Sequence, residues 1–177
     1  MKLSNISENM RDYTEEMLEN FYKRTQEHID TVAGHLKIVY ENIGGVLDNP
    51  DMLLLRAKNH DLSKFGPYEK YGYIWITEFY RCKNNGIDFS YPDGVEEQTK
   101  DASLHHITHN RYHPEFFDDV NDMNEIDIIE MVCDWQAMAD ELSEGSAKGW
   151  ADKNVGNRWK FNDTNIKIIY DTISILN

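Results

Sequence analysis

Residues 59–66, NHDLSKFG, place a histidine directly beside an aspartate, with a lysine three residues further on. Imidazole nitrogens and carboxylate oxygens are common ligands of divalent metal ions. At a helix end His60 and Asp61 diverge by about 100°, so both can reach one ion, or Asp61 can bridge two. An aspartate that caps the next helix beside an incidental histidine explains the same residues. Alone, the stretch leaves both interpretations open.

A second concentration of histidine occurs in HHITHNRYH, residues 105–113, which holds four of the seven histidines of the chain. His106 and His113 are seven residues apart, about two helical turns, and can point the same way. Asn110 lies between them, where it can contact a substrate or orient a ligand. Pro114 disfavours helical backbone at the preceding residue, so His113 should lie just beyond the helix. A polar helix face rich in histidine is the competing interpretation.

Two further positions could supply metal ligands. Asp134 lies within the apolar stretch EMVCDWQAM, where burial of a carboxylate is costly unless a cation or several hydrogen bonds meet it. A boundary position facing water is the alternative, and Glu130, one turn earlier, is the competing carboxylate. His28 and His35 share one face of the first long helical segment, where a core histidine with one hydrogen bond is the ordinary explanation.

Helical periodicity predicts the elements that must position these residues. No stretch alternates with the period of two that half-buried strands show. The expected fold is all-α, a single domain over 1–177 with six or seven helices, a core over about 20–140, and a C-terminal loop and helix over 143–177 that pack on it. The expected helices cover about 8–43, 52–65, 68–81, 96–112, 122–145 and 164–176, the last capped by Thr164, with loops over 83–98 and 143–160.

Charge and composition exclude several classes of function. The chain has 32 acidic and 18 basic residues, a net charge of -14, which disfavours nucleic-acid polymers and anionic membranes as partners. A small anionic substrate stays compatible, because a bound divalent cation reverses the local potential. Cys82 and Cys133 are not in a paired spacing, and no apolar run suits a signal peptide or membrane span. We expect a cytoplasmic protein, in the host cytoplasm if phage-encoded, and homo-oligomers stay open.

The order of these residues resembles the HD-domain superfamily of all-α metal-dependent phosphohydrolases, including a phage-associated branch of it. HDLSK is similar to the HD-x-x-K motif of HD-GYP cyclic dinucleotide phosphodiesterases and of myo-inositol oxygenase. The family's first helix carries histidine, valine four residues later, and a terminal glycine, as His28, Val32 and Gly44 do here. His35 also has a valine at that spacing. The separation of His28 from His60 suits the nucleotide-cleaving branches better, and the resemblance covers about residues 20–140.

The resemblance implies two divalent ions, of Mn, Mg, Co, Fe or Ni. One ion would be held by His28, His60, Asp61 and Asp134. The second would be held by His106 and His113, with Asp61 bridging the two ions. Two such ions activate water and polarise a phosphoryl group, which is chemistry suited to phosphoester cleavage.

The expected catalytic residues are Asp61, Lys64 and His109, of which His109 could protonate the leaving oxygen. Expected substrate contacts are Lys64, Asn110, Arg111, Arg158 and Lys160. The last two lie in NRWKF, a modestly basic stretch that also fits a solvated turn. The expected function is cleavage of a small nucleotide-like phosphoester. The alternatives are a di-iron oxygenase of the myo-inositol oxygenase type and a non-catalytic HD-fold nucleotide-binding protein.

Overall fold

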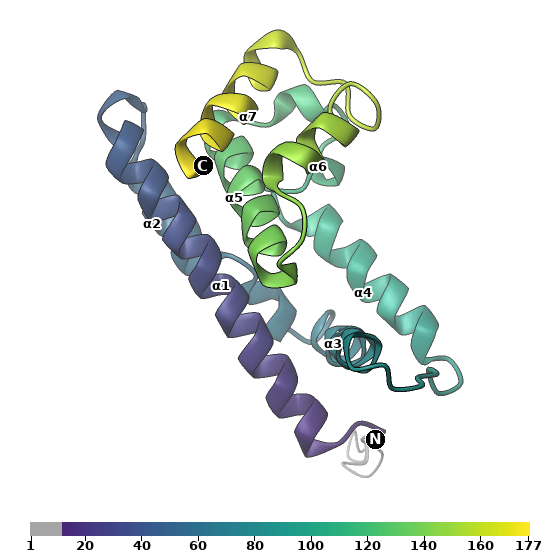
Figure 1. Ribbon diagram of the computed structural model, residues 1–177. Helices are drawn as coiled ribbons and strands as arrows, with labels where there is room; N and C mark the ends of the chain where they lie inside the picture. Colours follow the sequence, from purple (N-terminus) through teal and green to yellow (C-terminus); the bar gives the residue numbers. More distant parts are fainter. Residues whose placement is uncertain (1–11) are drawn as a thin grey trace, which may run out of the picture.

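The longest helix, α1 (Glu15–Ile43), runs along one side of the molecule (Figure 1). The computed structural model describes residues 12–177. Thr14 caps α1, because its hydroxyl oxygen accepts a hydrogen bond from the backbone N–H of Met17 at 3.2 Å. The helix therefore begins later than the predicted Glu8. Residues 12–14 are not helical, and residues 8–11 lie outside the described part of the chain.

Helices make up most of residues 12–177, and this part of the chain contains no strand. The prediction of an all-α fold is confirmed. The other α-helices are α2 (Asp51–Asn59), α3 (Lys70–Asn84), α4 (Val95–His109), α5 (Glu125–Leu142), α6 (Ala147–Asn154) and α7 (Asp163–Leu176). Four short 3-10 helices join them: η1 (Gly44–Val46), η2 (Leu62–Phe65), η3 (Pro114–Phe116) and η4 (Val120–Asp122).

The buried face of α1 is apolar on both sides of His28. Towards the N-terminus, Phe21 packs in a cluster with Ile74 of α3. Towards the C-terminus, Val32 packs in a second cluster with Ile129 of α5. His28 lies between these clusters and is itself buried. The first helix therefore carries the imidazole of His28 into the region where α1, α3 and α5 meet.

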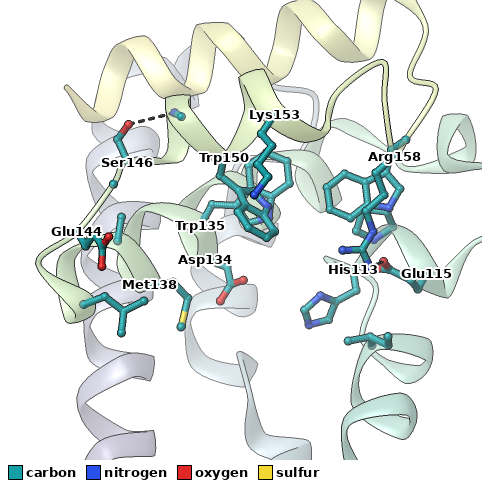
Figure 2. A pocket seen from close by; sticks show the side chains of 17 residues that line it. His113, Glu115, Asp134, Trp135, Met138, Glu144, Ser146, Trp150, Lys153 and Arg158 are labelled. Atoms are coloured by element: carbon teal, nitrogen blue, oxygen red, sulfur yellow. Dashed lines mark hydrogen bonds and ion pairs between the residues drawn. The ribbon is translucent and has the colours of Figure 1, made fainter. Parts of the chain in front are cut away.

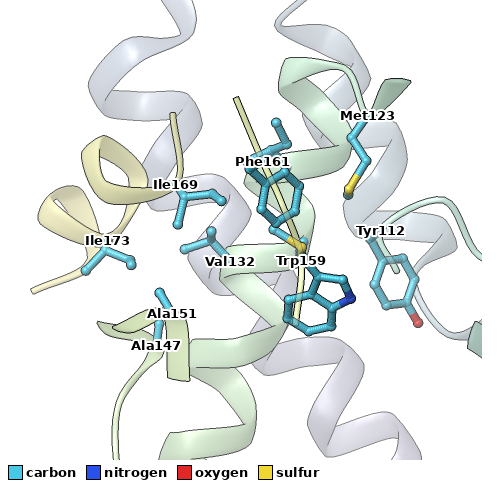
Figure 3. Packing of buried hydrophobic residues seen from close by; sticks show 11 residues of the cluster. Tyr112, Met123, Val132, Ala147, Ala151, Trp159, Phe161, Ile169 and Ile173 are labelled. Carbon is cyan, nitrogen blue, oxygen red and sulfur yellow. The ribbon is translucent and has the colours of Figure 1, made fainter. Parts of the chain in front are cut away.

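A third apolar cluster joins α5, α6 and α7 (Figure 3). Val132 of α5 and Ile169 of α7 are fully buried within it, as is Ala151 of α6. The ring of Tyr112 packs at the edge of this cluster, and its hydroxyl points away from the other labelled side chains (Figure 3). The cluster thus holds α6 and α7 against α5. It also anchors the ring of Tyr112, whose hydroxyl points out of the cluster.

The helix predicted over 52–65 ends at Asn59, where the chain reverses into η2. His60 follows the helix, and its backbone N–H still bonds to the carbonyl oxygen of Arg56 at 2.8 Å. Asp61 then has φ of 60°, a left-handed conformation that stops a right-handed helix. Aspartate tolerates this conformation better than most residues. The expectation of one continuous helix over 52–65 is therefore wrong.

Other helix boundaries also differ from the prediction. α3 spans 70–84 instead of 68–81, and α4 spans 95–109 instead of 96–112. The side chain of Asn110 ends α4 by donating to the carbonyl oxygen of His106 at 2.8 Å. His113 lies beyond this helix, as predicted.

The segment expected to be loop over 143–160 contains the two-turn helix α6. Ser146 caps α6 through the backbone N–H of Gly149, at 3.1 Å. α7 is capped by Asn162, whose side chain accepts from the N–H of Asn165 at 2.9 Å, and Thr164 already lies inside the helix. Both caps are short polar side chains, which favour this position.

Gly72 lets α3 approach α4 closely. A Cβ atom at this position would lie 2.4 Å from the Cβ of Ala102 and 2.9 Å from the carbonyl oxygen of Gln98. Only glycine fits without a shift of one backbone. Of the described helices, none combines the length and apolar character that a membrane span needs.

Candidate metal centre

Four of the predicted ligands converge from three separate segments. Nε2 of His28 on α1 lies 3.0 Å from Oδ1 of Asp134 on α5 and 3.7 Å from Oδ2 of Asp61. Nε2 of His60 lies 3.6 Å from Asp134 Oδ1 and 3.8 Å from Asp61 Oδ1. One donor atom each of His28, His60 and Asp61 lies within 4.8 Å of the others. Ligands about 2.0–2.2 Å from one ion have separations of this size.

The left-handed backbone at Asp61 directs its carboxylate into this cluster. The side chain is 1 % exposed and makes no capping hydrogen bond to η2. Its Oδ2 instead lies 2.5 Å from the ammonium of Lys64, and its Oδ1 accepts a hydrogen bond from the hydroxyl of Tyr112. The helix-cap interpretation of NHDLSKFG is therefore wrong for the side chain of Asp61.

His60 is oriented by a buried carboxylate behind it. Its Nδ1 lies 3.0 Å from Oε1 of Glu130, while Arg56 donates to Oε2 of the same carboxylate at 3.0 Å. Arg56 also pairs with Asp127 at 2.5 Å. With Nδ1 engaged, Nε2 of His60 is buried and has no hydrogen-bond partner among the described residues. A histidine held in this way presents its other nitrogen to a metal ion.

His106, on the other side of Asp61, is also oriented by a buried glutamate at its Nδ1. Its Nδ1 lies 2.8 Å from Oε2 of Glu69, and its Nε2 lies 3.3 Å from Oδ1 of Asp61. Glu69 is fully buried and also contacts Nδ1 of His105 through its other oxygen, at 2.7 Å. The hydroxyl of Tyr112 lies between the two groups, 2.9 Å from Nε2 of His106 and bonded to Asp61.

His113 lies beside His106 although the two residues do not share a helix. The ring centroids are 5.0 Å apart in an edge-to-face arrangement. Nε2 of His113 is buried without a hydrogen-bond partner in the described part of the chain. Burial lowers the pKa of His113 to about 4, so its imidazole is neutral and keeps a lone pair near pH 7.

The electrostatics of the cluster favour a cation. Burial alone would lower the pKa of His60, but Asp61, Asp134 and Glu130 outweigh it and raise the value to about 10. Burial likewise opposes the charged form of Asp134, but the hydrogen bond with His28 and the nearby imidazole of His60 hold its pKa far below the usual range. The carboxylates therefore stay ionised and draw positive charge to the histidine nitrogens, where a metal ion could replace a proton.

Of the predicted substrate-contact residues, Lys64 and Asn110 lie beside the cluster. Arg111, Lys160 and the predicted catalytic residue His109 do not. Lys64 pairs with Asp61, and the amide of Asn110 donates to Ser63 Oγ at 3.0 Å. Arg111 instead pairs with Asp127 at 2.7 Å. Lys160 is exposed and bonds to the carbonyl oxygen of Gly156. His109 is exposed and stacks on His105 at a centroid distance of 3.9 Å.

The two first-helix histidines lie in different surroundings. His28 joins the cluster, whereas Nε2 of His35 lies 2.9 Å from Oδ2 of Asp140, away from His60 and Asp61. The carboxylate of Glu141 lies 3.6 Å from Nδ1 of His28 and pairs with Arg24. α1 therefore contributes one histidine to the centre.

A cavity of about 670 Å³ opens onto one side of the centre (Figure 2). Asp134 and His113 line it at one edge, and Trp150 and Lys153 of α6 lie opposite them in this view (Figure 2). Arg158 also lines the cavity, where it pairs with Glu115 at 2.7 Å. The centre is thus buried yet reachable by a small molecule.

Sequence reasoning missed Glu69 and Tyr112 and treated Glu130 only as a competitor of Asp134. Glu69 follows a proline and a tyrosine in a segment rich in polar and aromatic residues, where no local pattern signals burial. Tyr112 stands directly before His113, and this proximity to a predicted ligand was the available signal. Glu130 and Asp134 are four residues apart on one helix, so both can face the same site.

Comparison with protein families gives one result. A family model described as a family of unknown function, DUF5662, matches residues 17–175. The chain belongs to this family. The match spans α1 to α7 and therefore includes every residue of the centre. No curated protein and no solved structure matches the chain.

Proposed function

We propose that this DUF5662 protein is a metal-dependent phosphohydrolase that cleaves a phosphoester of a small nucleotide-like substrate. The observation that carries the proposal is the convergence of His28, His60, Asp61 and Asp134, with His60 oriented by Glu130. Structural histidines rarely need a carboxylate behind one nitrogen while the other stays buried and unpartnered.

The donors suit a borderline or hard divalent cation. His28, His60, Asp61 and Asp134 would hold one ion, and His106, His113 and Asp61 are the donors for a second. Imidazole nitrogen and carboxylate oxygen are ligands that Mn, Fe, Co and Ni accept readily, whereas thiolate is absent from the described centre. A divalent cation bound there supplies a Lewis acid that polarises a phosphoryl group and activates water.

The remaining side chains have roles that follow from their positions. Glu130 and Glu69 fix the ring orientations of His60 and His106. Lys64, whose side chain is 17 % exposed and whose ammonium lies beside Asp61, can bind a phosphate oxygen. The hydroxyl of Tyr112 is held between Asp61 and His106, where its hydrogen bond orients the carboxylate of Asp61. His109 is exposed, and its proposed role as acid requires the substrate to reach its side of α4.

The resemblance to the HD-domain superfamily supports this proposal through the order of the ligands along the chain. The proposal also includes a cytoplasmic location, in a host cell if the gene is phage-borne. It further includes a small phosphorylated substrate in place of a nucleic-acid polymer. The acidic net charge of -14 supports the latter choice.

Elemental analysis of the purified protein, followed by a phosphate-release screen, tests the function. We expect bound Mn, Fe, Co, Ni or Mg and metal-dependent release from a nucleoside phosphate or cyclic nucleotide. Asp61→Asn should abolish both, and His35→Ala, which removes the histidine outside the centre, should change neither. Bound iron with oxygen-dependent substrate loss would instead indicate an oxygenase, and full metal occupancy without turnover of any phosphoester would indicate a binding protein.

A further inference from the structure

The cavity beside the centre extends well beyond the residues that the proposed chemistry uses. Asp134 and His113 form only one edge of its roughly 670 Å³. Ligand sites for small molecules span about 300–1,000 Å³, so the cavity can hold a molecule larger than a phosphate group. The other walls come from the end of α5, from α6 and from the segment after α6.

One side of α6 packs in the apolar cluster with α5 and α7, and the adjoining side faces the cavity. Ala147 and Ala151, one turn apart, are fully buried in the cluster with α5 and α7. Trp150 and Lys153 are three residues apart, so they are neighbours on the helix surface, and both line the cavity. The small alanines let α6 pack closely while the large side chains project over the cavity.

Three indole rings, of Trp135, Trp150 and Trp159, line this cavity. Trp135 and Trp159 are stacked, with centroids 5.9 Å apart and planes within 10°. Trp150 is 42 % exposed and lines the same cavity. Flat apolar faces that stay exposed at a concave surface are suited to stacking against a planar ligand group.

Two cations flank the rings in a chain whose net charge is -14. The guanidinium of Arg158 lies 4.7 Å from the centroid of Trp159 and pairs with Glu115. Among the described residues, Lys153 has no carboxylate within ion-pair distance, whereas Lys148 on the same helix pairs with Asp152 at 2.6 Å. An uncompensated ammonium beside an exposed indole favours a ligand that is both aromatic and anionic.

We infer that this cavity binds a planar aromatic ring joined to an anionic group, with the ring against Trp150 and the anion near Lys153. The inference rests on and deepens the proposed function, because Asp134 and His113 of the centre line the same cavity as Trp150 and Lys153. It excludes sugar phosphates and polyol phosphates as the preferred class, since neither offers a flat apolar face to the indole.

Calorimetric titration with AMP, adenosine and ribose 5-phosphate tests the inference, with EDTA present so that metal-dependent turnover cannot occur. AMP should bind more tightly than either fragment. Trp150→Leu should weaken AMP binding by about fivefold or more, the size of a lost ring stack, and leave ribose 5-phosphate unchanged. Trp150→Phe, which keeps a ring, should retain most of the affinity.

Lys153→Ala should weaken AMP and leave adenosine unchanged, because adenosine carries no anion. Matched controls are Tyr80→Leu, which removes a ring of similar exposure outside this cavity, and Lys148→Ala on α6. The inference is overturned if AMP fails to bind, if ribose 5-phosphate binds as tightly as AMP, or if Trp150→Leu weakens both equally. Because EDTA removes turnover, a failure of the phosphohydrolase proposal appears separately, in the phosphate-release screen.

Discussion

Glu130 holds Nδ1 of His60 at 3.0 Å, on the opposite side of the imidazole from the carboxylates of Asp61 and Asp134. This contact fixes which nitrogen of His60 faces the centre. It also explains how a fully buried glutamate is tolerated, since Arg56 pairs with its other oxygen.

Glu130→Gln should lower metal affinity by about 10- to 100-fold, the usual effect of losing a group that orients a ligand. Titration with Mn²⁺ followed by elemental analysis measures this change. Glu125→Gln on the same helix, at an exposed position, is the control and should bind metal as the wild type does. Equal affinities of the two variants would show that Glu130 does not orient His60.

Asp61→Asn should lose metal binding with little change in helix content, because asparagine accepts the left-handed backbone but lacks the charge. Asp61→Ala should lose metal as well and unfold more easily, by about 1 kcal/mol, since alanine is disfavoured at φ of 60°. Circular dichroism and urea unfolding separate the two effects. Retention of full metal occupancy by Asp61→Asn means that the centre has been assigned wrongly.

The number of ions depends on the side of the centre that contains His106. The resemblance predicts two ions, and His106→Ala should then reduce two equivalents of metal to one. Tyr112→Phe should strengthen the second site, because it removes a hydroxyl that lies 2.9 Å from Nε2 of His106 and bonds to Asp61. One equivalent of metal in both the wild type and Tyr112→Phe contradicts a two-ion centre.

Metal affinity should rise with pH between about pH 6 and 9. The pKa of His60 is raised to about 10, so its imidazole is protonated across this range and a proton must leave when metal binds. Each displaced proton makes the apparent affinity increase up to about tenfold per pH unit, and the increase stops above the raised pKa. Calorimetry in buffers of different ionisation enthalpy counts the protons released. A metal affinity that does not change with pH contradicts this assignment. The control is His35→Ala, whose metal affinity should have the same pH dependence as that of the wild type.

Gly72→Ala should destabilise the protein by about 1–3 kcal/mol, because the added methyl group overlaps Ala102 where α3 meets α4. Gly34→Ala is the matched control in α1, where the structure describes no atom within 4 Å of the new Cβ. That substitution should stabilise the protein by about 0.5–1 kcal/mol through helix propensity. The free energy of unfolding in urea reports both changes.

Periodic apolar residues predicted most of the helices, because each long helix buries one face. α6 was missed since it has only eight residues and is anchored by two alanines, which give almost no hydrophobic signal. The end of α2 was also misplaced. The side chain of Asp61, which has a left-handed backbone, bonds to the hydroxyl of Tyr112, 51 residues further along the chain and outside any local window.

For the candidate centre, the sequence predicted which residue types could meet but not which residues support them. His28 was preferred over His35 from spacing, and the structure places only His28 beside His60. Glu69 could not be found in this way, because its burial results from the close packing of α3 on α4. Such long-range contacts are created by tertiary packing alone.

The separation of His28 from Asp134 along the chain, 106 residues, has a consequence for folding. A cation shared by these two side chains acts as a cross-link that closes most of the chain into a loop. Closing a long loop removes many conformations from the unfolded ensemble, and binding to the native state alone raises the melting temperature with metal concentration. Loss of metal in a living cell would then make the protein more susceptible to proteolysis, in addition to removing the proposed activity.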